Sequence, residues 1–166
     1  MQMTMQQLLL IELEREAVAT RKMLSRLPQE HFGWKPHEKS FSLLQLALHI
    51  AEMVGWVGVT VQTEKLDFAE TPYIPPQASS TAELLQFFEE NLNNSILALR
   101  NVTDEDLTVL WKMCNGDTIY FEMPRHVALR SMVLNHTYHH RGQLSVYMRQ
   151  LGIPLPSVYG PSADER

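Results

Sequence analysis

Four long segments of this chain carry apolar residues spaced three and four positions apart, which is the spacing of one face of an α-helix. Segments rich in Pro, Gly, Ser and aromatic residues separate them. Amphipathic helices of this length bury their apolar stripes against one another, so the pattern predicts an all-α four-helix bundle. The four segments run from about residue 4 to 27, from Ser40 or Ser42 to Thr60, from residue 80 to 101 and from Pro124 to Gly152.

The connections between these helices are long. Residues 61–79 are enough to span the ~30 Å of a 20-residue helix, which would let two neighbouring helices run parallel. Residues 103–123 hold Asn115-Gly116, a tight-turn signal between two short apolar runs, and predict a small irregular hairpin before the last helix. Loops of this length at the end of a bundle can also wall a pocket.

Length, charge and cysteine usage narrow the class of protein. A chain of 166 residues has interior enough for one sizeable core, so residues 1–166 are expected to form a single domain. The net charge is −5 and the basic residues are scattered, which argues against a nucleic-acid partner. Cys114 is the single cysteine and is interpreted as a packing residue. No signal peptide is recognised and no apolar run approaches ~20 residues, so a cytoplasmic protein without a membrane partner is expected.

Two histidines of the last segment, His136 and His140, are the strongest functional signal. They lie one helical turn apart, about 40° around the axis, and can therefore bind one ion together. Both fall on the apolar stripe formed by Leu129, Val133, His136, His140, Leu144, Tyr147 and Leu151. The spacing thus directs both rings towards the core.

His49 lies on the corresponding stripe of the second segment, between Leu46 and Met53. An unpaired imidazole in an apolar core costs about 1 to 3 kcal/mol for each unsatisfied group, and three such rings need a common explanation. A divalent metal held by His49, His136 and His140 supplies one, because bundles build metal sites from facing helices. The alternative is that each ring is a hydrogen-bonded packing residue.

Other polar residues receive weaker interpretations. Glu52 follows His49 by three positions, and either orients that ring as a second-shell acceptor or is solvated, the reading the sequence favours. His139 leaves the ligand stripe and is expected to face a neighbouring helix or the surface. Arg141 points away from the ligands, towards a helix contact or a dimer surface. The remaining expectations are solvated side chains at Glu12, Glu16, His31, His37 and His126.

Several stretches of the chain can be compared with known families. The most specific are residues 46–51 (LALHIA), 136–144 (HTYHHRGQL) and 154–162 (PLPSVYGPS), supported by 34–36 (WKP) and 103–107 (TDEDL). In these stretches and in their order, the chain resembles the DinB-like superfamily of damage-inducible proteins. The resemblance implies an up-down-down-up four-helix bundle, often dimeric. It also implies three histidine ligands, which fall on His49, His136 and His140, for zinc, nickel or another divalent ion such as iron or manganese.

Three protein ligands leave a coordination position for water or substrate, which is typical of catalytic rather than structural sites. The resemblance implies transfer of a low-molecular-weight thiol of the bacillithiol or mycothiol type to a small-molecule substrate. In this hypothesis the metal lowers the pKa of the thiol. Two alternatives stay open: a hydrolase that activates water on the metal, and a non-catalytic metal-binding or ligand-binding bundle. No catalytic residue beyond the metal ligands is assigned, and a homodimer is expected.

Overall fold

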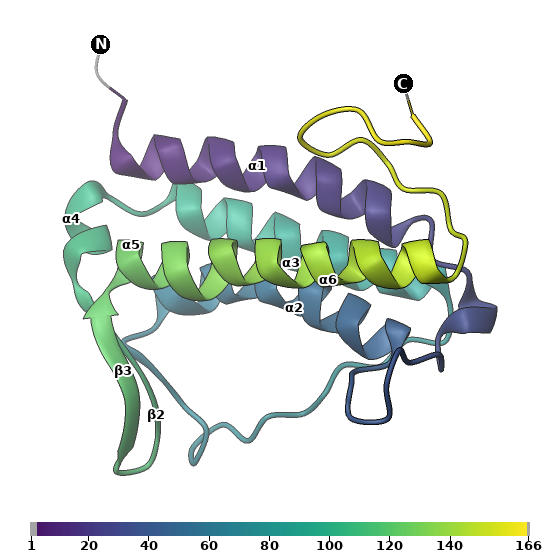
Figure 1. Ribbon diagram of the computed structural model, residues 1–166. Helices are drawn as coiled ribbons and strands as arrows, with labels where there is room; N and C mark the ends of the chain where they lie inside the picture. The colour runs from purple at the N-terminus through teal and green to yellow at the C-terminus, as the bar shows by residue number, and fades with distance from the viewer. Residues whose placement is uncertain (1–2, 166) are drawn as a thin grey trace.

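The structure is a computed structural model that describes residues 3–165, and its main elements are long helices lying side by side (Figure 1). The long helices are α1 (Met5–Leu24), α2 (Leu43–Gln62), α3 (Thr81–Arg100) and a last segment that consists of α5 (Arg125–Ala128), a π-helical stretch (Leu129–Leu134) and α6 (Asn135–Gln150). The shorter elements are a 3₁₀ turn (Gln29–His31), β1 (Lys65–Asp67), α4 (Asp104–Thr108), β2 (Leu110–Asn115) and β3 (Thr118–Pro124).

Side-chain caps explain where three of the long helices begin. Thr4 and Ser42 each form a capping box, in which the hydroxyl accepts from the N3 backbone and the N3 glutamine returns a bond to the cap. The second helix therefore starts after Ser42 and not after Ser40. Ser80 caps α3 by accepting from the Glu83 amide, whereas the Glu83 carboxylate turns back to the Ser79 amide at 2.7 Å. The first helix ends at Leu24, three residues before the expected limit.

The direction of the helices follows from the long connections. Figure 1 shows that α1 and α6 run one way and that α2 and α3 run the other way. The segment after α2 returns along the length of the molecule before α3 begins, as the length of residues 61–79 predicts. The parallel pair α2 and α3 packs closely: a Cβ on Gly55 would lie 2.7 Å from Asn91 Oδ1, so a side chain at position 55 would require the Asn91 amide to move. Ser95 Oγ donates to the Val54 carbonyl across the same contact at 2.8 Å.

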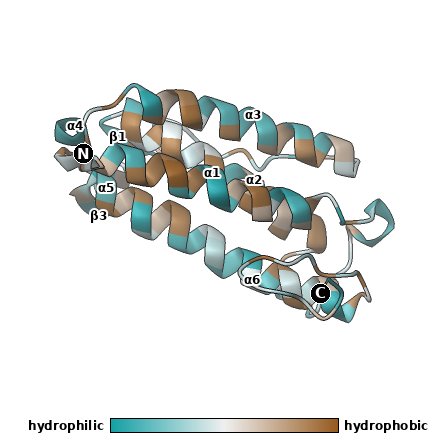
Figure 2. Cartoon of the chain, turned by 90° about the horizontal axis from the view of Figure 1, so that it is seen from above, coloured by the Kyte–Doolittle hydropathy of each residue, from teal (hydrophilic) through white to brown (hydrophobic). Residues whose placement is uncertain are grey.

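Helix α2 forms the centre of the core. Figure 2 shows apolar and polar faces along α1 and α3, as expected of amphipathic helices. Helix α2 instead has buried residues along most of its length, and by length and composition alone it could also cross a membrane. The expected absence of a long apolar stretch was therefore wrong for this helix. Because 61% of that apolar window is buried inside the protein, the core accounts for the apolarity of α2.

A three-stranded sheet corrects the all-α expectation. Strands β2 and β3 form the expected antiparallel hairpin, and Gly116 (φ +57°) makes its turn in the left-handed region. Strand β1 adds in parallel to β2, with Leu66 opposite Met113. Neither β1 nor α4 was predicted, because three- and five-residue elements are too short to show a period. The sheet packs on the helices through Trp111, which is 1% exposed.

Asp67 ties the connection after α2 to the hairpin turn. Its carboxylate accepts from the backbone amides of Gly116 (2.9 Å) and Ala69 (3.0 Å) and from Lys65 Nζ (3.1 Å). The Gly116 amide and the Lys65 ammonium hold the pKa of Asp67 well below its usual range. Neighbouring Cys114 is 2% exposed, and burial raises the pKa of its thiol. A buried, protonated thiol agrees with the packing role expected of Cys114.

The last helical segment is continuous but irregular. Pro124 precedes it and Gly152 (φ +70°) follows it, with the Ile153 amide donating to the Met148 carbonyl in a Schellman-type end. The π-helical stretch was not predicted. Beyond it the buried residues of α6 are Thr137, Arg141, Leu144 and Met148. Leu144 lies on the expected stripe, whereas Thr137, Arg141 and Met148 each follow an expected stripe residue by one position. His136 and His140 consequently lie half-buried at the edge of the core.

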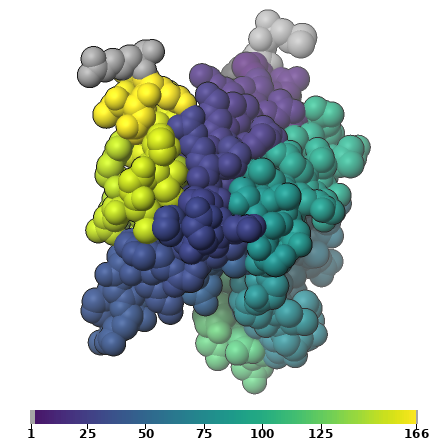
Figure 3. Space-filling model, turned by 90° about the vertical axis from the view of Figure 1, so that its right-hand side faces the viewer, coloured from purple at the N-terminus to yellow at the C-terminus, as the bar shows by residue number. Residues whose placement is uncertain are grey.

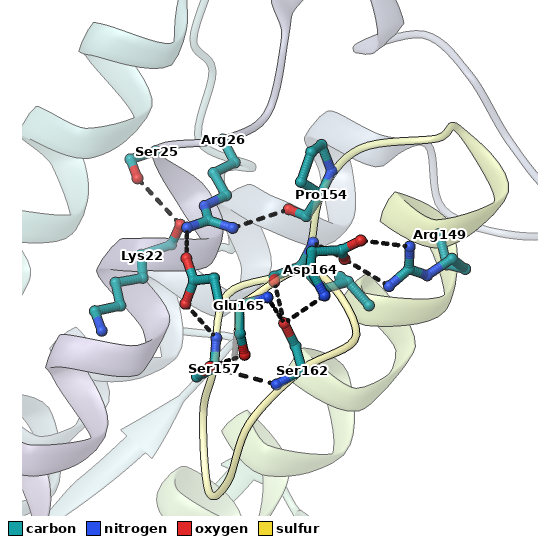
Figure 4. A network of polar contacts seen from close by, with 10 residues as sticks. Lys22, Ser25, Arg26, Arg149, Pro154, Ser157, Ser162, Asp164 and Glu165 are labelled. Carbon is teal, nitrogen blue, oxygen red and sulfur yellow. Dashed lines mark hydrogen bonds and ion pairs between the residues drawn. The ribbon is translucent and has the colours of Figure 1, made fainter.

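The C-terminal residues 151–165 fold back beside α1 (Figures 1 and 3). Two acidic residues hold this tail in place (Figure 4): Asp164 pairs with Arg149 at 2.7 Å, and Glu165 pairs with Arg26 and accepts from the Ser157 amide at 2.8 Å. The position of the tail brings Tyr159 onto Glu16 of α1, where the tyrosine hydroxyl donates to the carboxylate at 2.8 Å.

Candidate metal centre

The three histidines singled out in the sequence lie together, one from α2 and two from α6. One ring nitrogen from each lies within 4.8 Å of the others, and this group could hold a metal ion. The ring centroids are 4.6 Å apart for His136 and His140, 4.7 Å for His49 and His140, and 5.2 Å for His49 and His136. Three imidazoles from facing helices are a donor set that suits zinc, nickel or iron.

The hydrogen bonds around the two α6 rings decide which nitrogens are free. His140 Nδ1 lies 2.7 Å from Gln143 Oε1, and an amide oxygen only accepts, so the ring proton is placed on Nδ1. His140 Nε2 therefore presents a lone pair, and it faces His136 Nε2 at 2.8 Å. An outer partner on the second nitrogen is also what orients metal-bound histidines. Gln143 is thus placed to orient His140.

His136 has a less satisfied environment. Its Nδ1 is buried and makes no hydrogen bond of good geometry, although the backbone of Met132 favours the protonated ring. Its Nε2 lies 2.8 Å from His140 Nε2, and the tautomer of His136 decides the nature of this contact. With the His136 proton on Nε2 the two rings share a hydrogen bond, and with the proton on Nδ1 both Nε2 atoms are acceptors that one divalent ion could bind.

The local electrostatics keep the rings in the form that binds metal. Burial lowers the pKa of His136, and the neighbouring His49 lowers it further. Burial also lowers the pKa of His140, against the opposing effect of its hydrogen bond to Gln143. Neutral imidazole is the ligand form, so little proton competition is expected at neutral pH.

The sequence favoured a solvated Glu52, but the structure places this side chain beside His49. Its side chain is 17% exposed, and its Oε2 lies 3.8 Å from His49 Nδ1, beyond hydrogen-bonding distance. The same oxygen accepts from the Tyr73 hydroxyl at 2.9 Å. Burial and this bond raise the pKa of Tyr73 to about 12, so its hydroxyl remains a donor. The position of Glu52 agrees with the alternative reading, in which it lies next to His49 without being a metal ligand itself.

A cleft opens on the His49 side of the triad. It consists of two hollows of about 250 Å³ and about 360 Å³, and both are lined by Phe41, His49 and Tyr73. Leu44 and Leu48 help to line the smaller one, and the connection between α2 and α3 contributes Tyr73 to both. This wall bears out the idea that a long connection closes a pocket.

The remaining histidines lie outside the triad. His139 is exposed, and its Nε2 lies 3.0 Å from Gln143 Nε2. His126 was expected to be solvated. Its Nδ1 instead lies 2.9 Å from the Leu107 carbonyl oxygen, within hydrogen-bonding distance. His37 is exposed and His31 is partly exposed.

Two residues of the site were missed in the sequence. Gln143 could have been found, because a polar residue three positions after a helical ligand lies on the same face. Tyr73 carries no such signal, since it belongs to a connection without regular structure.

The opposite side of α6 carries a different polar cluster around Arg141. This residue is 4% exposed and donates to the Glu16 carboxylate at 2.5 Å and to Thr20 Oγ1 at 3.2 Å. Its guanidinium also lies over the rings of Tyr138 (5.4 Å) and Tyr159 (5.3 Å). Of the two roles considered for Arg141, the structure shows the helix contact.

The expectation of a solvated α1 face is therefore wrong for two of its acidic residues. Glu16 pairs with Arg141. Glu12 accepts from the Tyr138 hydroxyl at 2.7 Å and pairs with Arg130. Both carboxylates thus join α1 to the last helical segment, because a stripe pattern cannot show that a charged face lies against another helix.

Comparison with known proteins agrees with this architecture. The chain is 28% identical over 158 residues to the uncharacterized protein YrdA of Bacillus subtilis, covering 92% of this chain and 86% of YrdA. It is 21% identical over 133 residues to the uncharacterized protein YjoA of the same organism, covering 80% and 82%.

Solved structures show the same fold. A DinB-like protein from Bacillus cereus superposes with a TM-score of 0.70 at 26% identity, covering 91% of this chain and 95% of that one. The DinB-like protein YjoA from Bacillus subtilis superposes with a TM-score of 0.69 at 18% identity, covering 96% and 99%. The DinB family model matches residues 1–166. The chain therefore belongs to the DinB family.

Proposed function

We propose that this protein is a metal-dependent transferase that joins a low-molecular-weight thiol, of the bacillithiol or mycothiol type, to a small electrophile. One zinc or nickel ion on His49, His136 and His140 is the proposed cofactor. The observation that carries the proposal is that three converging imidazoles border, through His49, an apolar cleft large enough for a small ligand.

The ligand count supports a catalytic rather than a structural ion. Three protein ligands leave a position that a substrate can occupy, whereas structural zinc sites are closed by four. Helices α1 and α6 run in one direction, and α2 and α3 run in the opposite direction. This arrangement supports an up-down-down-up bundle, which would hold the three ligands rigidly. A rigid frame keeps the three nitrogens converged when the open position changes occupant.

In this proposal the ion activates the thiol, and side chains of the protein orient the reacting groups. A divalent ion held by the triad would lower the pKa of a thiol bound beside it. The thiol proton passes to water, the sulfur bonds to the electrophilic carbon, and the leaving group departs with its bonding pair. Gln143 would orient His140 during this step, and the apolar side chains of the cleft would contact the electrophile.

A hydrolase is the second candidate, and Glu52 is the observation that favours it. Its carboxylate lines the larger hollow and lies 3.8 Å from His49 Nδ1, so it is near enough to the triad to accept a proton from an attacking water. The Tyr73 hydroxyl already occupies part of its acceptor capacity. We therefore rank hydrolysis below thiol transfer.

The test is turnover by protein loaded with one equivalent of zinc or nickel, assayed with a panel of thiols and electrophiles. We expect product only when thiol and electrophile are both present, and none with His136→Ala. Turnover of esters or amides without thiol would replace the transferase with the hydrolase. No turnover by folded, metal-loaded protein in either panel would support a non-catalytic metal-binding protein.

A homodimer and a cytoplasmic location complete the proposal. The family resemblance supports the dimer, and the single buried cysteine agrees with a reducing compartment. Sedimentation velocity at micromolar concentration tests the dimer, and fractionation of the producing cell tests the location.

A further inference from the structure

The larger hollow of the cleft has an unusual lining. Besides the triad residue His49 it is walled by four aromatic side chains, Phe41, Trp56, Phe68 and Tyr73, and by one carboxylate, Glu52. These residues come from three parts of the chain: the end of the connection before α2, α2 itself, and the connection between α2 and α3. Aromatic rings attract cations through the negative potential of their faces, so a lining of four aromatic rings and one carboxylate suits a cation better than an anion.

The charge pattern around the cleft points the same way. Within residues 3–165, no lysine or arginine lines either hollow. The nearest basic side chain along the connection, Lys65, is held by Asp67 and Glu70 at 3.1 and 2.8 Å. An anionic ligand would therefore meet the Glu52 carboxylate without a compensating positive group from the lining, whereas a cationic ligand would be matched.

The aromatic residues at the opening are also poorly buried for their type. Phe41 is 49% exposed and Tyr73 is 51% exposed, although both line the two hollows. Phe41 stacks edge to face with His49 at 6.0 Å, so its position is defined by packing and not by solvent contact alone. Glu52 is held towards the cleft by the hydrogen bond from Tyr73. The carboxylate and the rings are thus positioned before any ligand arrives.

We propose that this hollow binds the ammonium group of a small organic cation, with Phe41, Trp56, Phe68 and Tyr73 as the aromatic walls and Glu52 as the counter-ion. A volume of about 360 Å³ lies near the lower limit of ordinary ligand pockets, so the hollow can accommodate a trimethylammonium group together with part of the molecule that carries it. The site adjoins the histidine triad, so the ammonium group belongs to a molecule whose remainder reaches the proposed metal. Recognition of the cation itself does not require the ion.

The experiment compares choline with 3,3-dimethylbutan-1-ol, which has the same shape and hydroxyl group and lacks the positive charge. Isothermal titration is carried out with the full chain as purified and again after chelation of metal. We expect choline to bind the metal-free protein at least about tenfold more tightly than the neutral alcohol, the combined scale of one counter-ion and of cation–π contacts with partly exposed rings. Equal affinities, or no binding of choline at millimolar concentration, would overturn the proposal.

Matched variants assign the preference to the residues. Glu52→Gln removes the counter-ion and is expected to reduce the choline preference to about twofold or less, whereas Glu105→Gln removes the same charge from an exposed position on α4 and leaves the preference intact. Phe41→Ala is expected to weaken the binding of both choline and the alcohol. Ile119 of β3 is an apolar residue of similar exposure, and Ile119→Ala is expected to change the binding of neither ligand. A full preference in Glu52→Gln would overturn the assignment of the counter-ion.

The outcome can be separated from that of the proposed function. If the choline preference is found but the protein binds no metal, the cation site stands and the transferase proposal fails. If metal binds and thiol transfer occurs but choline and the alcohol bind alike, the cation site fails and the transferase proposal stands.

Discussion

His140 and Arg141 are neighbours on α6, yet they lie in two polar clusters that differ in how completely their polar atoms are paired. Arg141 points to α1, where its guanidinium finds a carboxylate, a hydroxyl, a carbonyl and two aromatic rings. His140 points to α2, where one nitrogen is held by Gln143 and the other faces a second imidazole nitrogen. Nearby His136 has a buried Nδ1 without a hydrogen bond.

The difference separates polar groups whose partners lie within the fold from polar groups that remain available to a ligand. A buried charge that is fully paired locks two elements together, and removing one partner strands the other. Ring nitrogens left unpaired cost free energy in the metal-free chain, and that cost is recovered only when something binds them. We therefore expect substitutions on the Arg141 side to change stability and substitutions on the His140 side to change ligand binding.

The largest effect on stability is expected from Arg141→Ala. It leaves Glu16 without its buried partner, so the free energy of unfolding should fall by about 3 kcal/mol, measured by urea denaturation. Arg100→Ala is the control, because its pair with Glu14 is exposed on both sides and should contribute less than about 1 kcal/mol. Bound metal per folded chain should be unchanged in both. A loss equal to that of the control would show that the Arg141 network does not lock α1 to α6.

The largest effect on ligand binding is expected from His49→Ala, His136→Ala and His140→Ala. Each should lower metal affinity by more than about 100-fold, since loss of an outer partner alone costs roughly 10- to 100-fold. Elemental analysis of protein purified without an affinity tag measures the stoichiometry. In metal-free protein the same substitutions should change the free energy of unfolding by less than about 1 kcal/mol. Stoichiometric metal in all three variants would remove the triad as the site.

A smaller effect on the same side is expected from Gln143→Ala. The change removes the acceptor that orients His140, so metal affinity should fall by about 10- to 100-fold with the three ligands still present. Gln150→Ala, at the exposed end of α6, is the control. Competition with a chelator of known affinity measures both. An unchanged affinity would mean that helix packing alone orients the ring.

The smallest effect is expected when the stability of the metal-free protein is measured as the pH is lowered from neutrality. Burial lowers the pKa of His136 and His140 in the folded chain below their ordinary value of about 6.5. As the pH falls below that value, the unfolded chain takes up protons that the folded chain resists, so metal-free protein should lose stability. In His136→Ala this loss should be smaller. A pH dependence identical in the variant and the parent would contradict the role of burial.

The helices were predictable from the sequence because each carries its own period and its own end signals. Ser80, Pro124 and Gly152 act locally, and their effect does not depend on distant residues. Strand β1 was not predictable, because it exists only by pairing with β2, some fifty residues away in the chain. The pairing of Glu12 and Glu16 with the last helical segment was not predictable either, since a charged face looks alike whether water or another helix covers it.

The candidate site divides in the same way. The sequence predicts that His136 and His140 share a helix face and that His49 interrupts an apolar stripe, because helical spacing is a local property. Only the tertiary structure shows the two α6 rings at the edge of the core, because beyond the π-helical stretch Thr137 and Arg141 are buried in place of His136 and His140. It alone also decided the surroundings of His49, since Phe41, Glu52 and Tyr73 meet only when the connection after α2 folds back over the helix.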